Sequence, residues 1–306
     1  MASSSDPKPQ PTIEIPVLRK GPFFLTGAPK SGTTWLGRIL DAHPEIACRG
    51  EACVHHFALA LVETCQGYRK LLAERRKVVT DSNDFPDLRW KDVLALMRTF
   101  ITLRLDAIDD PAKPGLRFLG EKDPEHALHI RELDRLFPEA KFIHIIRDGR
   151  GVFLSAWHHN VRSNYDELES IDFDGFLDIT AKEWAERVQA ARSAGKDLGD
   201  GNRYIEVRYE DLVSDPHAEV ARIFAFLGAD ASAATVKACV EAASFEKLSG
   251  GRKAGEEDAS SFFRKGVPDD WKRQLTPVQL QRFAALAGAT LMELGYWIGP
   301  DTVPFL

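Results

Sequence analysis

The chain has 306 residues, of which 44% are hydrophobic and 28% charged, an ordinary globular composition. Its net charge of −6 argues against broad nucleic-acid binding, which needs a basic face, but it leaves room for a local basic pocket that takes a phosphorylated ligand. No apolar run approaches the roughly 20 residues needed to span a bilayer.

The N-terminal region and the cysteines indicate the compartment. The first twenty residues are rich in Ser, Pro and Lys and lack the apolar core of a signal peptide, so residues 1–20 are predicted to be a flexible tail. The cysteines follow no metal or disulfide spacing, which favours free thiols in a reducing cytosol, with a disulfide between Cys48 and Cys53 left open. We therefore expect a cytoplasmic protein without a membrane span, with a single domain over residues 21–306.

The first predicted structural unit is a strand, a glycine turn and a helix. Phe23–Leu25 is a short apolar run typical of a buried strand, and Leu36–Leu40 lies in the helix. The turn between them is built on Gly27, Pro29 and Gly32. This geometry aims free backbone N–H groups and a helix N-terminus at an anion. Lys30 adds a full charge, and hydroxyl donors come from Ser31, Thr33 and Thr34.

This turn is close to the P-loop of nucleoside triphosphatases but departs from it. Gly27 and Gly32 have the G-x-x-x-x-G spacing, yet Thr33 stands where the P-loop has its lysine. The lysine here, Lys30, lies inside the loop instead. The turn is therefore predicted to hold a phosphate group without the triphosphate–magnesium unit of an ATPase.

The middle of the chain alternates strands with helices. Residues 47–51 are predicted to be a short connection, and residues 54–106 are mostly helical in pattern, with a charge run on a solvated face. A strand is predicted over 117–120, a helix over 126–137 and a strongly apolar strand over 141–146. Near-continuous apolar strands separated by helices indicate an α/β fold with a P-loop-like central parallel sheet flanked by helices.

The rest of the chain is predicted to be mostly helical. In chain order we expect a helix from 149 through 157, a loop over 160–174, a helix over 176–194, a strand over 203–209, helices over 216–228 and 233–247, a charged surface loop over 249–270, and a closing helix over 277–294.

Polar side chains follow the ends of three predicted strands. They are Lys30 with Ser31, Lys122 with Asp123, and Arg147 with Asp148. In an open α/β sheet, ligands bind beyond the carboxyl ends of the strands. A magnesium-binding Walker B strand would end in Asp. The strand predicted over 141–146 is instead followed first by Arg147, whose guanidinium prefers phosphate or carboxylate. The pattern favours an anion site that does not need a metal.

The run Pro29–Trp35 resembles the 5′-phosphosulfate loop of sulfotransferases, enzymes that use 3′-phosphoadenosine 5′-phosphosulfate. The resemblance extends over three separated stretches, roughly residues 22–52, 117–158 and 203–272, in the order found in that family. Golgi members of the family carry a membrane anchor, so the resemblance implies a bacterial-style or cytosolic member. It also implies that residues 21–306 are the sulfotransferase domain.

The resemblance implies a set of donor-binding residues. Arg147 and Ser155 correspond to residues that bind the 3′-phosphate, and Trp35, Phe245 and Tyr209 to residues that contact the adenine. Arg264, Lys265 and Gly266 are similar to a loop that closes over the 3′-phosphate, although Asp269 stands where the family has Gly before the Asp-Trp-Lys run.

The resemblance also bears on the general base. Cytosolic phenol and steroid sulfotransferases have a His two residues after the strand-end lysine, where this chain has Pro124. Tyrosylprotein and related sulfotransferases instead use a glutamate after the loop helix, in the pattern Asp-Ala-His-Pro-Glu followed by Cys-x-x-Glu. This chain has Asp41–Glu45 and then Cys48–Glu51, together with a Lys-Asp-Pro run at 122–124. Glu51 is therefore the expected base, and the alternatives are His55, His56 and His126.

These motifs predict in-line transfer of a sulfuryl group from 3′-phosphoadenosine 5′-phosphosulfate to a hydroxyl acceptor, which gives a sulfate ester and adenosine 3′,5′-bisphosphate. Lys30 and Lys122 are expected to neutralise the charge on the leaving 5′-phosphate, and no metal is required. Two alternatives stay open: a P-loop-type small-molecule kinase and a non-catalytic nucleotide-binding protein. The acceptor, a glycan, peptide, lipid or small molecule, is expected to lie against residues 54–106 and 160–174, and the oligomeric state is left open.

Overall fold

A computed structural model describes residues 17–78, 86–163, 171–199, 201–253, 255–258, 261 and 267–296. Of the predicted N-terminal tail, only residues 17–20 belong to these ranges. Every helix within them is too short or too polar to serve as a membrane span. All four cysteines are free thiols, as predicted.

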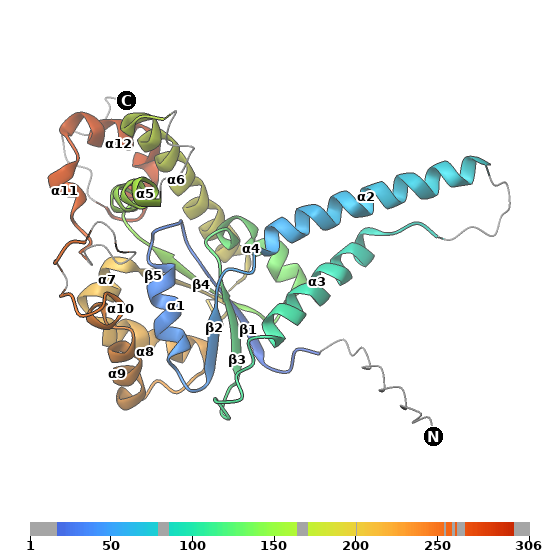
Figure 1. Cartoon of the computed structure of the whole chain (residues 1–306), viewed down its shortest axis with the longest axis horizontal. Helices are drawn as coiled ribbons and strands as arrows, with labels where there is room; N and C mark the ends of the chain where they lie inside the picture. Colours follow the sequence, from blue (N-terminus) through green and yellow to red (C-terminus); the bar gives the residue numbers. More distant parts are fainter. Residues whose placement is uncertain are drawn as a thin grey trace, which may run out of the picture.

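Five parallel strands form one central sheet in the order β2-β3-β1-β4-β5 (Figure 1). The strands are β1 Gly21–Thr26, β2 Ile46–Arg49, β3 Phe118–Lys122, β4 Lys141–Ile146 and β5 Tyr204–Arg208. The predicted parallel sheet is therefore confirmed, and the strand predicted over 141–146 coincides with β4.

The edge strand β2 contradicts the connection predicted over 47–51. Ile46 to Arg49 pair in parallel with Phe118 to Glu121 of β3. The strand is only four residues long, and its apolar run, Ile46 to Cys48, is too short to be told from a buried turn or helix segment by pattern alone. Its extended conformation comes from backbone pairing with its neighbour, which a local pattern does not reveal.

Helices cover both faces of the sheet. On one face lie α1 Thr33–Asp41, α7 Tyr209–Ser214, α8 Pro216–Leu227 and α9 Ala233–Ala242, and on the other α3 Trp90–Asp106, α4 His126–Leu136 and α6 Phe173–Asp197. Phe23 and Leu25 of β1 pack in the first of these cores, and Phe24 between them packs in the second. Alternate side chains of a strand point to opposite faces, so a strand buried on both sides is apolar at every position.

A third core lies beyond the carboxyl end of β4. It is built by α5 Gly149–Ser163, α6, α11 Trp271–Gln274 and α12 Pro277–Glu293. Trp184 of α6 is fully buried there against Phe283, and its indole Nε1 donates a hydrogen bond to the carbonyl oxygen of Arg147 at 3.0 Å. This core therefore fixes the backbone at the end of β4.

Two predicted elements in the helical part, the loop over 160–174 and the helix over 233–247, differ from the structure. The loop predicted over 160–174 is helical at both ends, because α5 continues to Ser163 and α6 begins at Phe173; residues 164–170 lie outside the described ranges. Asp172 accepts a hydrogen bond from the backbone N–H of Gly175 and so starts α6. The helix predicted over 233–247 is divided into α9 and α10 Phe245–Leu248, because Ser244 caps the second segment.

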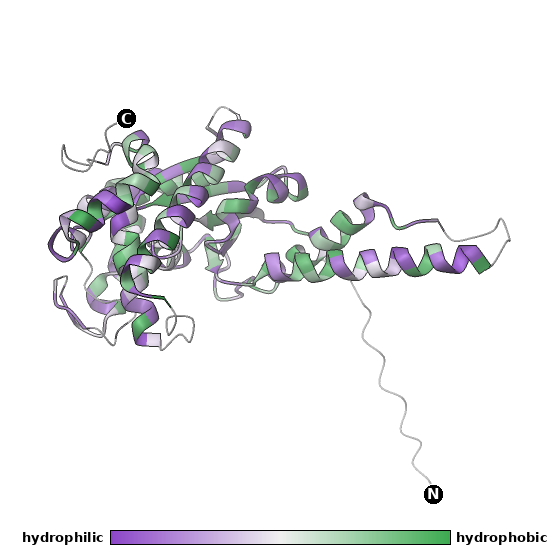
Figure 2. Ribbon diagram, turned by 90° about the horizontal axis from the view of Figure 1, so that it is seen from above, coloured by the Kyte–Doolittle hydropathy of each residue, from purple (hydrophilic) through white to green (hydrophobic). Residues whose placement is uncertain are grey.

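The helices α2 Val54–Val78 and α3 pack as a hairpin that projects from the body of the molecule (Figures 1 and 2). The predicted helical character is confirmed, and the charge run at the outer end of α2 is largely exposed, as predicted. Only Val54 and Cys65 of α2 are buried, and Phe57 stacks on Phe100 of α3 with ring centroids 3.6 Å apart. Both helices expose large apolar side chains, including Leu59, Leu71, Val78, Trp90, Leu96 and Leu103.

Candidate active site

The loop between β1 and α1 depends on two glycines. Gly27 has a φ of 155°, and a Cβ atom there would lie 2.3 Å from the carbonyl oxygen of Ile145. Gly32 has a φ of 104°, and its Cβ atom would lie 2.7 Å from the ring of Tyr209. Only glycine fits these positions, so the loop lies close against the ends of β4 and β5.

The start of α1 is open to a ligand. Its N-cap is Gly32, which has no side chain to accept from the first backbone N–H groups of the helix. The hydroxyl of Ser31 is fully buried and has no hydrogen-bond partner within the described residues. Because buried polar groups are nearly always paired, these groups together suit a bound anion.

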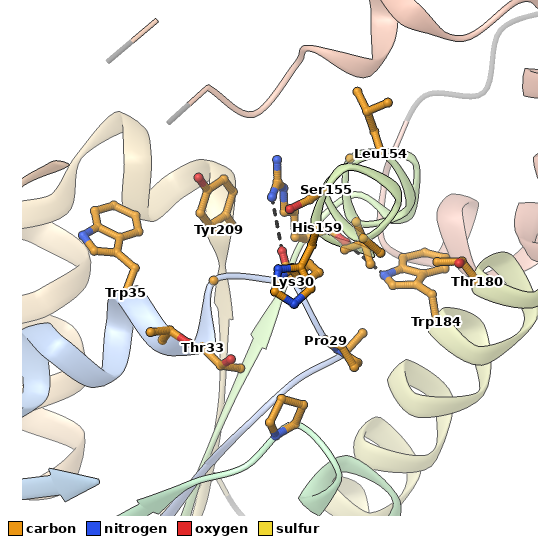
Figure 3. A pocket seen from close by; sticks show the side chains of 18 of the residues that line it. Pro29, Lys30, Thr33, Trp35, Leu154, Ser155, His159, Thr180, Trp184 and Tyr209 are labelled. Atoms are coloured by element: carbon orange, nitrogen blue, oxygen red, sulfur yellow. Dashed lines mark hydrogen bonds between the residues drawn. The ribbon is translucent and has the colours of Figure 1, made fainter. Parts of the chain in front are cut away.

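Lys30 lies among other cations. Burial and the charges of Arg162, Lys122 and Arg147 together lower the pKa of Lys30 to about 8, although Glu51 acts in the opposite direction. Ser155 and His159 of α5 line the same cavity as Lys30 (Figure 3), and the charge of Lys30 lowers the pKa of His159. A lysine whose charged form is disfavoured in the free protein gains most from an anion placed beside it.

Arg147 follows β4 directly and faces the same loop. Its Nη1 donates to the carbonyl oxygen of Lys30 at 3.2 Å, and its guanidinium carbon lies 4.5 Å from the ring centroid of Tyr209. Its Nε is buried without a partner among the described residues. Asp148 pairs instead with Arg150, at 2.7 Å and 2.9 Å, so this carboxylate does not occupy Arg147.

Three aromatic side chains lie on the α1 side of the loop. Trp35 and Tyr209 meet edge to face with centroids 5.9 Å apart, and Trp35 Nε1 donates to the carbonyl oxygen of Ala243 at 2.9 Å. Phe245, at the start of α10, has the guanidinium of Arg252 over its ring at 5.6 Å. These rings provide flat apolar walls beside a cationic loop.

Glu51 and Lys122 form a pair at the end of β3. Lys122 Nζ donates a hydrogen bond to Glu51 Oε1. The Lys122 side chain is 12% exposed, whereas that of Glu51 is 46% exposed. The next residue, Ala52, donates its backbone N–H to Glu121 Oε1 at 2.9 Å, which holds the Glu51 segment against β3.

These groups surround one cavity of about 1300 Å³. The predicted site residues that line it are Lys30, Gly32, Thr33, Thr34, Trp35, Glu51, Arg147, Ser155, Tyr209 and Phe245. Ser31 and Lys122 do not line it, and Arg264, Lys265 and Gly266 lie outside the described residues. Of the alternative bases, His55 and His56 line the cavity and His126 does not.

Residues 22–233 match the sulfotransferase family, which is about two thirds of the chain. The chain belongs to the sulfotransferase family. The matched part contains the β1–α1 loop, Glu51, Lys122, Arg147 and Ser155.

Two curated relatives within the sulfotransferases share substantial sequence. Protein-tyrosine sulfotransferase 2 of Gallus gallus is 32% identical over 216 residues, which is 70% of this chain and 52% of the relative. The omega-hydroxy-beta-dihydromenaquinone-9 sulfotransferase of Mycobacterium bovis is 36% identical over 108 residues, 35% of this chain and 28% of the relative. The chain therefore spans about half the length of the first and just over a quarter of the second.

A solved sulfotransferase structure has the same fold. The mouse sulfotransferase SULT7A1 complexed with PAP aligns with a TM-score of 0.57 at 19% sequence identity, over 92% of this chain and 89% of that one. This similarity confirms the predicted P-loop-like α/β architecture.

Sequence reasoning missed several residues that line the cavity of this sulfotransferase. His159 lies four residues after Ser155 on α5, a spacing that puts both side chains on one helix face and that would have identified it. Burial and the charges of Lys30 and Arg162 lower the pKa of His159 to about 4. Thr180 and Trp184 of α6 also line the cavity, and nothing in an amphipathic helix pattern marks them as site residues.

The predicted acceptor walls agree only in part with this cavity. Among the described residues of the segment 54–106, His55 and His56 line the cavity. The rest of the hairpin projects away from it. From the segment 160–174, Asn160 and Ile171 line the cavity. At the carboxyl end of β3, Glu121, Asp123 and His126 form a buried group with potential metal-ligand atoms within 4.8 Å of one another.

Proposed function

We propose that this chain transfers the sulfuryl group of 3′-phosphoadenosine 5′-phosphosulfate to a hydroxyl acceptor. The observation that carries the proposal is that one cavity is lined by the open start of α1, by Lys30 and Arg147, and by the Glu51 carboxylate. The first three groups attract an anionic nucleotide, and the carboxylate supplies a proton acceptor beside it. Membership of the sulfotransferase family supports the same reaction.

The donor would bind along the β1–α1 loop. The 5′-phosphate would accept hydrogen bonds from the backbone and hydroxyl groups of residues 31–34 and from Lys30, and the 3′-phosphate from Arg147 and Ser155. Trp35, Tyr209 and Phe245 would hold the adenine. Arg264, Lys265 and Gly266 remain a prediction for closing over the 3′-phosphate.

Glu51 would accept the proton of the acceptor hydroxyl. As the acceptor oxygen forms its bond to sulfur, the bond between sulfur and the bridging phosphate oxygen breaks, and its electron pair leaves with adenosine 3′,5′-bisphosphate. Lys122, hydrogen-bonded to Glu51, would stabilise the charge that develops on the leaving oxygen together with Lys30. No step in this scheme needs a metal ion.

The acceptor would reach the cavity on the side of Glu51, His55 and His56. Relatives act on protein tyrosine and on a hydroxylated dihydromenaquinone, as their names state, so we propose a peptide or lipid hydroxyl as the acceptor. A cavity of about 1300 Å³ leaves room for such a group beside a nucleotide. We also propose that residues 21–306 act as one domain and that the protein is cytoplasmic.

Calorimetric titration with adenosine 3′,5′-bisphosphate in EDTA tests the donor site, with AMP and ATP as matched controls. We expect micromolar or tighter binding of the bisphosphate and much weaker binding of AMP, which lacks the 3′-phosphate. Preference for ATP, and only with magnesium, would replace the proposal with the kinase alternative. Tight bisphosphate binding without transfer to any hydroxyl acceptor would favour a non-catalytic nucleotide-binding protein.

A further inference from the structure

Four side chains with metal-ligand chemistry meet at the carboxyl end of β3, and two of them, His55 and Asp123, also line the cavity. Glu121 lies in β3, Asp123 follows the strand, His126 begins α4, and His55 lies in the first turn of α2. Glu121, Asp123 and His126 are 5%, 3% and 1% exposed. Residues from separate parts of the chain thus bring two carboxylates and two imidazoles into a mostly buried space.

The polar atoms of this group are only partly satisfied by one another: the His126 imidazole pairs with the Glu121 carboxylate at 3.3 Å, but without the geometry of a full hydrogen bond. Eight buried side-chain nitrogen and oxygen atoms in the described ranges lack a hydrogen-bond partner, and three of them are here: His55 Nδ1, Asp123 Oδ2 and His126 Nε2. Neither carboxylate forms an ion pair with Lys or Arg among the described residues, since Lys122 turns away to Glu51. Native proteins rarely leave several such atoms unpaired in one place, which points to a missing ligand.

The spacing of these atoms fits a common ion. His126 Nε2 lies 3.3 Å from Glu121 Oε2, and His55 Nδ1 lies 3.9 Å from Asp123 Oδ2. Zinc bonds to imidazole nitrogen and carboxylate oxygen are about 2.0–2.2 Å long, so two ligand atoms on a tetrahedral zinc ion lie about 3.4 Å apart. Glu121, Asp123 and His126 each offer an atom within 4.8 Å of the others, and His55 reaches this group through Asp123, so a shift of the His55 side chain would be needed for it to serve as the fourth ligand.

We propose that Glu121, Asp123, His126 and His55 bind a divalent transition-metal ion, with Zn²⁺ as the best fit. Two nitrogen and two oxygen ligands in tetrahedral arrangement suit zinc, whereas magnesium prefers six oxygen ligands in octahedral geometry. The second carboxylate oxygens of Glu121 and Asp123 accept backbone hydrogen bonds, which orient both side chains. Glu121 Oε1 accepts from the backbone N–H of Ala52 at 2.9 Å, and Asp123 Oδ1 accepts from that of Glu125 at 3.0 Å.

The ion would position the Glu51–Lys122 pair without touching the donor. Glu51 stands four residues before His55, and Lys122 stands between Glu121 and Asp123. Binding an ion between these segments would fix the first turn of α2 against the end of β3. It would also remove His55 and His126 as candidate bases, because a metal-bound imidazole nitrogen cannot accept a proton.

The test is zinc binding to the full-length chain after removal of metals with a chelator. Calorimetry with ZnCl₂ should show saturable binding of one ion per chain with micromolar or tighter affinity, and MgCl₂ should show none. Glu121→Gln and His55→Ala should each weaken zinc binding by about 10- to 100-fold or more. His217→Ala, at an exposed histidine of α8, is the matched control and should leave it unchanged.

Two further measurements keep the outcomes distinct. Zinc should raise the thermal unfolding midpoint of the wild type and not that of Glu121→Gln. His55 is half-buried, so His55→Ala tests zinc binding without a cavity in the core. Bisphosphate affinity should be the same with and without zinc, because none of the four ligands is among the residues proposed to hold the nucleotide. If the wild type shows no saturable zinc binding, or if both variants retain it, the group is a buried set of ion pairs and the proposal is wrong.

Discussion

The guanidinium of Arg147 lies over the ring of Tyr209, 4.5 Å from its centroid, while the buried carboxylate of Asp148 beside it pairs with Arg150 instead. The aromatic ring orients the arginine without neutralising its charge, so the guanidinium stays available to an anion. Neighbouring residues in the sequence thus have different functions: Arg147 faces the cavity, and Asp148 stabilises the turn into α5.

Arg147→Ala should weaken binding of adenosine 3′,5′-bisphosphate. A hydrogen bond to a charged group contributes about 1.5–3 kcal/mol, so we expect the dissociation constant to rise about 10- to 100-fold in calorimetry. AMP, which lacks the 3′-phosphate, should lose little affinity. Arg131→Ala, which removes an exposed arginine paired with Asp197, is the control. Equal loss for both nucleotides would show that Arg147 does not contact the 3′-phosphate.

Glu51→Gln should lower turnover while leaving donor binding intact. General base catalysis contributes about 10²- to 10⁴-fold, and the amide keeps the size of the side chain. The rate of sulfate-ester formation and the calorimetric affinity for the bisphosphate measure the two effects separately. Glu63→Gln, at an exposed position of α2, is the matched control. Near-full turnover in Glu51→Gln, together with its loss in Lys30→Ala, would remove Glu51 as the base.

Lys30 should make donor binding depend on pH. Burial and the charges of neighbouring cations lower its pKa to about 8 from a usual value of 10.5, so in the free protein it is charged below pH 8 and loses its proton above it. Bisphosphate affinity should be constant below about pH 8 and then fall by up to about tenfold per pH unit. Lys30→Arg should keep its affinity to higher pH, because arginine stays protonated. A wild-type affinity that is flat from pH 7 to pH 10 would contradict this role.

The same shift affects stability with a defined sign. Between pH 8 and 10.5 the unfolded chain binds a proton at Lys30 that the folded chain does not, so Lys30 makes the free energy of unfolding rise with pH in this window. Saturating bisphosphate should reduce this contribution, because the anion stabilises the charged lysine. Urea unfolding of the wild type and of Lys30→Met at pH 7 and pH 9.5, with and without the bisphosphate, measures the contribution of Lys30 to the pH dependence of the free energy of unfolding.

Gly27→Ala and Gly67→Ala should act in opposite directions. At Gly27, the new Cβ would lie 2.3 Å from the carbonyl oxygen of Ile145, so we expect a loss of about 1–3 kcal/mol in the free energy of unfolding and weaker bisphosphate binding. Gly67 lies inside the exposed helix α2 with nothing within 4 Å of the added atom, and alanine there should stabilise the protein by about 0.5–1 kcal/mol. Urea denaturation compares the two.

The sequence predicted the elements whose side chains are buried on both faces better than those held by pairing alone. The run at 141–146 is apolar at nearly every position and coincides with β4, whereas the edge strand β2 has little pattern of its own. Local caps decided other errors. Ser244 divides a helical run into α9 and α10, and Asp172 starts α6 inside a predicted loop.

The same contrast holds for the site. The β1–α1 loop could be predicted because glycine spacing and a lysine report directly on backbone geometry, and Arg147 because it ends a strand. His159 lies one helical turn after Ser155 and could have been identified from that spacing, whereas Trp184 lines the cavity through the packing of α6, which the chain does not show locally. The roles of Glu51 and Ser155, and of Arg264 to Gly266, which lie outside the described residues, stay predictions.

The projecting hairpin gives the acceptor side of the cavity a mechanical connection to a distant point. Its helix α2 starts three residues after Glu51 and runs without interruption for 25 residues, about 37 Å. The donor loop is attached to a different strand and a different helix. A molecule bound at the outer end of α2 would therefore act on the segment that carries Glu51, the proposed base, and we expect it to change the rate of transfer while leaving the affinity for the nucleotide unchanged.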